Sequence, residues 1–68
     1  MAKWQKVYST NILHQAEIVK GVLEEHGLKP VIISKKDQLY HFGHYEVHTS
    51  PDEVMESINI IKNEIRFE

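Results

Sequence analysis

One stretch of the chain, residues 11–27, has the clearest periodic pattern in the sequence and limits what the rest can fold into. Apolar residues recur there at intervals of three and four, which places them on one side of a helix. They are Ile12, Ala16, Val19 and Leu23, with Val22 at the edge of the stripe. The opposite side is polar, so the pattern predicts a helix with one buried and one solvated face. Thr10 or Asn11 is expected to cap its first turn, and Gly27 to end it.

A second helix is predicted after Ser50, where the sequence has the features of a helix start. Ser50 is a favourable N-cap, Pro51 follows at the first helical position, and Glu53 is placed to complete a capping box with the serine. The expected buried stripe consists of Val54, Ile58, Ile61 and Ile65, with Met55, Ile60 and Phe67 outside it. The two helices therefore each offer one apolar stripe that must pack against something else.

Two segments rich in β-branched and aromatic residues are predicted to be strands. The first covers residues 3–8, with Trp4, Lys6 and Tyr8 on one face and Gln5 and Val7 on the other. We expect Val7 to point toward the core. The second covers residues 31–33 and begins after Pro30, where a missing backbone N–H is tolerated at the start of a strand.

A third strand, residues 44–49, alternates strictly. One face carries Tyr45, Val47 and Thr49, and the other carries His44, Glu46 and His48. A period of two is typical of a strand with one buried and one solvated face. The element order β-α-β-β-α then predicts a single α+β domain over residues 1–68, a ferredoxin-like sandwich with a three-stranded antiparallel sheet and two helices on one face. A right-handed crossover places the third strand between the first and the second.

Composition limits the classes of function. The chain of 68 residues has no cysteine, which removes disulfides, thiolate metal sites and a cysteine nucleophile. Its net charge is -2 and its lysines and arginines are scattered, unlike the basic surface of a nucleic-acid binder. No segment approaches the roughly 18 apolar residues of a membrane span. We therefore expect a cytoplasmic protein with no cofactor and with neither nucleic acid nor a membrane as its partner.

The polar face of the third strand is the candidate site for chemistry. His44, Glu46 and His48 point the same way, and imidazole and carboxylate groups are zinc ligands. His41 is a fourth ligand only if the loop before this strand folds back. The alternatives are a strand face with solvated polar side chains and a pH-sensing group of histidines. No nucleophile with a neighbouring base and no phosphate-binding loop is found, so an enzyme is not expected.

Apolar residues outside the expected core favour an interaction surface. They include Trp4 and Tyr8 on the open sheet face and Leu39, Tyr40 and Phe42 in the loop of residues 34–43. The alternative is that the loop aromatics fold over the end of a small core. In the expected fold the first strand is an edge strand, which can pair with a second copy or with an extended peptide. The leading hypothesis is a non-catalytic interaction module with a protein partner, or a homodimer.

Several short motifs lie between residue 4 and about residue 61. They are Val7-Tyr8-Ser9, Ala16-Glu17, the segment from Lys20 to Gly27, Pro30-Val31-Ile32-Ile33, Lys35-Lys36-Asp37, Tyr40, Phe42-Gly43 and Glu46-Val47. In these motifs the chain resembles a family of small bacterial signal-transducing proteins that is classed as a domain of unknown function. The resemblance implies a fold similar to the ferredoxin-like core of the PII nitrogen regulators, and a signalling role. The motifs consist of structural residues, and the sequence has no nucleotide-binding loop of the PII type.

Overall fold

The computed structural model describes residues 3–36 and 43–65. Their order is β1 (Gln5–Thr10), α1 (Leu13–Glu25), β2 (Val31–Lys36), β3 (Gly43–Thr49), a short 3-10 turn η1 (Pro51–Glu53) and α2 (Val54–Glu64). This order confirms the predicted β-α-β-β-α arrangement of an α+β domain, which is compatible with a ferredoxin-like fold.

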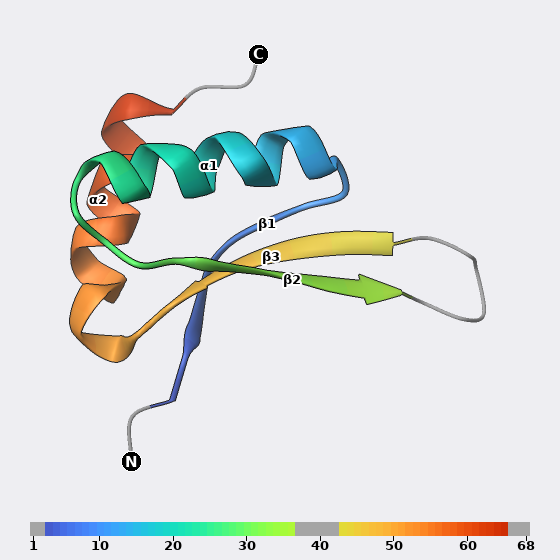
Figure 1. Ribbon diagram of the computed structural model, residues 1–68, viewed down its shortest axis with the longest axis horizontal. Helices are drawn as coiled ribbons and strands as arrows, with labels where there is room; N and C mark the ends of the chain where they lie inside the picture. Colours follow the sequence, from blue (N-terminus) through green and yellow to red (C-terminus); the bar gives the residue numbers. More distant parts are fainter. Residues whose placement is uncertain (1–2, 37–42, 66–68) are drawn as a thin grey trace.

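The sheet has the strand order β1-β3-β2, and β3 is antiparallel to both of its neighbours. The prediction that the third strand lies in the centre is therefore confirmed. Figure 1 shows the sheet nearly edge-on, with α1 lying along one side of it and α2 crossing beyond the C-terminal end of α1. No described helix covers the other side of the sheet (Figure 1).

The hydrophobic core lies between the sheet and the helices. Its fully or almost fully buried members are Ala16, Val19 and Leu23 of α1, Val47 of β3 and Ile60 of α2. Other apolar side chains that pack against this cluster are Val7, Tyr8, Val22, Leu28, Ile32, Tyr45, Ile61 and Ile65. The predicted stripe of α1 is thus confirmed, except that Ile12 precedes the helix as its N-cap residue and is exposed.

The start of α1 differs from its prediction, because Ile12 is the N-cap residue and neither Thr10 nor Asn11 caps the first turn through its side chain. The hydroxyl of Thr10 accepts a hydrogen bond from the N–H of Ile12 at 3.1 Å and donates one to Oε1 of Gln15 at 2.8 Å. At the other end Gly27 has a φ of 85°, in the left-handed region that glycine adopts without strain. The N–H of Leu28 donates to the carbonyl of Leu23, and that of Gly27 donates to the carbonyl of Glu24, which completes a Schellman motif. Gly27 ends the helix as predicted.

The first strand differs from its prediction because it contains a β-bulge. Lys6 is opposite His48, but Tyr8 is opposite the adjacent residue Val47, so Val7 is an extra residue in β1. The bulge puts Tyr8 on the core side of the sheet, where it packs against the core cluster. The prediction that Tyr8 shares the open face with Lys6 is therefore wrong, whereas Val7 packs against the core as expected. Figure 1 shows the change of direction within β1.

The second helix also differs from its prediction. It buries Ser57 and Ile60 rather than Ile58, which is exposed, although Ile61 and Ile65 do pack against the core. The buried face is selected by contact with α1 and β1, and not by the most apolar stripe of the isolated helix. The predicted capping box is not formed, because Glu53 instead accepts a hydrogen bond through Oε1 from the backbone N–H of Lys29 at 3.1 Å.

Candidate functional site

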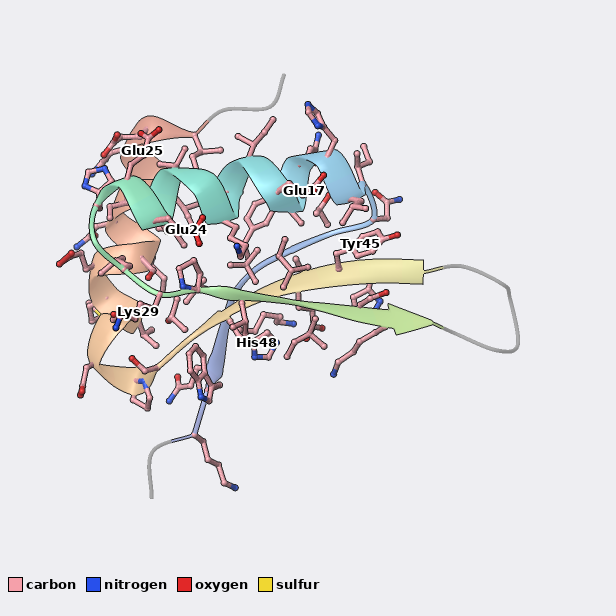
Figure 2. All side chains as sticks on the ribbon, viewed as in Figure 1. Glu17, Glu24, Glu25, Lys29, Tyr45 and His48 are labelled. Carbon is pink, nitrogen blue, oxygen red and sulfur yellow. The ribbon has the colours of Figure 1, made fainter. Side chains whose placement is uncertain are left out.

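The open face of the sheet is the side that lies away from α1. Strand alternation and the register between strands assign eight side chains to it: Lys6, Ser9, Val31, Ile33, Lys35, His44, Glu46 and His48. Figure 2 shows Tyr45 on the side of the sheet that faces α1 and His48 on the opposite side. The predicted alternation of β3 is therefore confirmed, and its polar face is the centre of the open face.

Glu46 lies at the centre of a cluster of charged and polar groups. Its side chain is almost buried, because the whole residue is only 7% exposed. Nε2 of His48 lies 2.9 Å from Oε1, and Nε2 of His44 lies 3.0 Å from Oε2. An ionised carboxylate can only accept hydrogen bonds, so both imidazoles donate from Nε2–H. Each histidine thus satisfies a different oxygen of the same carboxylate.

Two lysines from the neighbouring strands complete the cluster. Nζ of Lys35 lies 3.6 Å from Oε1 of Glu46, and Nζ of Lys6 lies 3.9 Å from Oε2. At these distances each ammonium group forms an ion pair with the carboxylate of Glu46, but both contacts are too long for hydrogen bonds. Both lysine side chains are more than half exposed, at 54% for Lys6 and 53% for Lys35. Their ammonium groups are therefore held beside the carboxylate and still face solvent.

The cluster lowers the pKa of Glu46 from 4.5 to about 2. The hydrogen bond from His48 is the largest cause, followed by the hydrogen bond from His44, and both outweigh the burial that alone would raise the pKa. The positive charges of Lys35 and Lys6 lower it further. Glu46 is consequently ionised at neutral pH. One negative and two lysine charges give the cluster a net charge of +1.

The geometry of the cluster differs from that of a metal centre. Nε2 of both histidines is hydrogen-bonded to Glu46, so a metal bound at either atom would have to replace that hydrogen bond. Among residues 3–36 and 43–65, no group of three or more His, Cys, Asp or Glu side chains is placed to hold a metal ion. His41, considered as a fourth ligand, lies outside the described residues.

The residues predicted to form an interaction surface have different locations. Trp4 lies just before β1 and is 49% exposed, whereas Tyr8 packs against the core. Leu39, Tyr40 and Phe42 lie outside the described residues. Sequence reasoning missed Val31, Ile33 and Lys35, which are on the open face opposite His48, Glu46 and His44. A period of two within β2 was the signal that could have found them. Ile32 is opposite the core residue Val47, so its neighbours Val31 and Ile33 must point to the open face.

Comparison of the chain with protein-family models, with curated proteins and with solved structures finds no match in any of the three. The resemblance to the bacterial signal-transducing family therefore stays a prediction from the sequence motifs. In the described part of the chain, neither helix has the length and apolar character that crossing a membrane requires.

Proposed function

We propose that this chain is a non-catalytic interaction module with a regulatory or signal-transducing role, which binds another protein or a second copy of itself through the open face and the edges of its sheet. The observation that carries the proposal is the composition of the open face. It combines an exposed apolar side chain, Val31, and a half-buried one, Ile33, with a fixed cluster of charges, and no helix within the described residues covers it.

The apolar side chains of β2 distinguish this face from an ordinary solvated one. An antiparallel sheet with one wet face normally has polar residues at the outward positions of its strands. Val31 and Ile33 occupy such positions here, and Val31 is 40% exposed. Apolar contact area next to polar and charged groups is the usual composition of a protein interface. The open face therefore supports binding of a macromolecule more than simple contact with water.

The two outer strands offer a second mode of contact. Each pairs only with β3 in the described part of the chain, so each has an outer edge. The sequence predicted such an edge at the first strand. In the structure the bulge at Val7 interrupts the pairing of β1 with β3, and α2 contacts β1. The register of β2 with β3 is unbroken from Val31 to Lys36. The edge of β2 is thus better suited to pairing with an extended partner strand.

The electrostatics of Glu46 support a role without catalysis. A general acid or base works best with a pKa near the operating pH. The hydrogen bonds from His48 and His44 move the pKa of Glu46 the other way, to about 2, and so fix the carboxylate as an anion. A charge that does not change at neutral pH is suited to positioning its neighbours.

Site-specific photo-crosslinking tests the proposal. A photoreactive amino acid is placed at Val31 on the open face or, as a matched control, at Ile18 on α1, where the native residue is 38% exposed. We expect covalent adducts from the Val31 position in the cells that naturally produce the protein, and none of the same adducts from Ile18. Mass spectrometry then distinguishes an adduct of two copies from an adduct with another protein. Equal labelling from both positions, or labelling from Ile18 alone, would contradict the proposal.

A further inference from the structure

The charges of this protein are separated between its helices and its sheet. The helical elements α1, η1 and α2 carry seven acidic residues and only two lysines. The three strands carry three lysines and one acidic residue, Glu46. Figure 2 shows Glu17, Glu24 and Glu25 on α1, with His48 on the far side of the sheet. On the open face itself the charged residues are Lys6, Lys35 and Glu46, so a protein with a net charge of -2 has a locally positive open face.

Glu46 neutralises only one of the two lysine charges on this face. Its two oxygens already accept hydrogen bonds from His44 and His48, and Lys6 and Lys35 lie beyond hydrogen-bond distance from it. An ammonium group has three N–H donors. The two lysines are therefore held on either side of one carboxylate, and their side chains are exposed enough to pair with a second anion as well.

We propose that the open face binds an acidic segment of a protein partner, whose carboxylates pair with Lys6 and Lys35 and whose apolar side chains contact Val31 and Ile33. This inference rests on the proposed function and names the chemistry of the partner. A single small anion would use the lysines alone and would leave Val31 and Ile33 without a contact. A peptide that alternates acidic and apolar residues uses both kinds of side chain on this face.

The rest of the surface favours the same occupant at the same place. The acidic residues of α1 and α2 repel a negatively charged segment from the helical side. Complementary charge attracts it to the open face and raises its rate of association, in a manner that salt weakens. The helical side of a second copy is also acidic, so binding of the sheet of one copy to the helices of another is the main competing arrangement. The experiment must distinguish this self-association from binding of a partner's acidic segment.

The test is a titration followed by backbone amide resonances. The probe is a short synthetic peptide of glutamate and leucine, compared with the same peptide containing glutamine for glutamate and with inorganic phosphate alone. We expect the acidic peptide to shift the resonances of β2 and β3 at low salt. Combined substitution Lys6→Gln and Lys35→Gln should weaken binding about tenfold, the sum of two partly exposed ion pairs. The control Lys20→Gln with Lys62→Gln makes the same change of net charge on the helices and should leave the affinity unchanged.

Several results would overturn this inference. They are equal binding of the glutamine peptide, equal loss in the two double variants, the same shifts with phosphate at similar affinity, and a concentration-dependent doubling of mass in light scattering without peptide. The first two exclude recognition of the acidic charge by these lysines, the third indicates a small-anion site, and the fourth indicates a second copy as the occupant. If Val31 forms crosslinks to a partner but the acidic peptide does not bind, this inference fails while the proposed function stands. If Val31 forms no crosslink, the proposed function itself fails.

Discussion

Replacing Glu46 by glutamine should change how the stability of the protein depends on pH. The folded state holds the pKa of Glu46 at about 2, against 4.5 for the free group. A depressed folded-state pKa contributes stability that is fully present above pH 4.5 and is lost as the pH falls through the folded value of about 2. Halfway between the two values, unfolding takes up about 0.9 of a proton at this one carboxyl group. Glu46→Gln abolishes this proton uptake on unfolding, because glutamine does not titrate.

The assay is urea unfolding at a series of pH values between 2 and 7. The slope of the free energy of unfolding against pH reports the number of protons taken up. Glu17→Gln on α1 is the matched control, because it makes the same change of charge away from the cluster. We expect the slope near pH 3 to be lower in Glu46→Gln than in Glu17→Gln by about 0.9 of a proton. Identical slopes in the two variants would refute the view that His44 and His48 hold Glu46 as an anion.

Three further predictions concern the same sheet. His48→Gln should raise the pKa of Glu46 more than His44→Gln does, because the hydrogen bond from His48 is the larger cause of the lowered pKa. Carboxyl carbon NMR measures the pKa of Glu46 in both variants. A larger rise in His44→Gln would contradict this ranking. Thr49→Val should stabilise the protein by about 1 kcal/mol, or roughly 4–8 °C in Tm, because the buried hydroxyl of Thr49 has no hydrogen-bond partner among the described residues. A lower Tm in the variant would show that the hydroxyl does have a partner. Micromolar zinc should not shift the His44 and His48 resonances together, because zinc at Nε2 would have to break the hydrogen bonds to Glu46. Joint movement of the two resonances would support the metal hypothesis.

The features that follow from regular periodicity could be predicted from the sequence. Ala16, Val19 and Leu23 are buried because a helix of constant pitch brings residues three and four apart to one side. The polar face of β3 follows from a period of two, and Gly27 ends α1 because it has the positive φ that such a position favours. The central position of the third strand agrees with the split β-α-β arrangement that the element order predicts.

The remaining features depend on contacts between segments that are distant in the sequence. One extra residue at Val7 moves Tyr8 to the other face, and no local pattern marks the position of a bulge. Ser57 is buried in α2 because of what the helix touches, although apolar spacing favours Ile58. The environment of Glu46 combines three strands, so its lysine partners became known only with the register of the sheet.

The central claim is that a partner binds to the open face and not to the helical side. The most direct test measures the affinity of the partner recovered by crosslinking for Val31→Asp and for Ile18→Asp. The native residues are similarly exposed, at 40% and 38%, but lie on β2 and on α1. Because an acid within the contact area repels an acidic segment, Val31→Asp should weaken binding about tenfold or more, and Ile18→Asp should leave it unchanged. Equal losses, or a loss in Ile18→Asp alone, would contradict the claim.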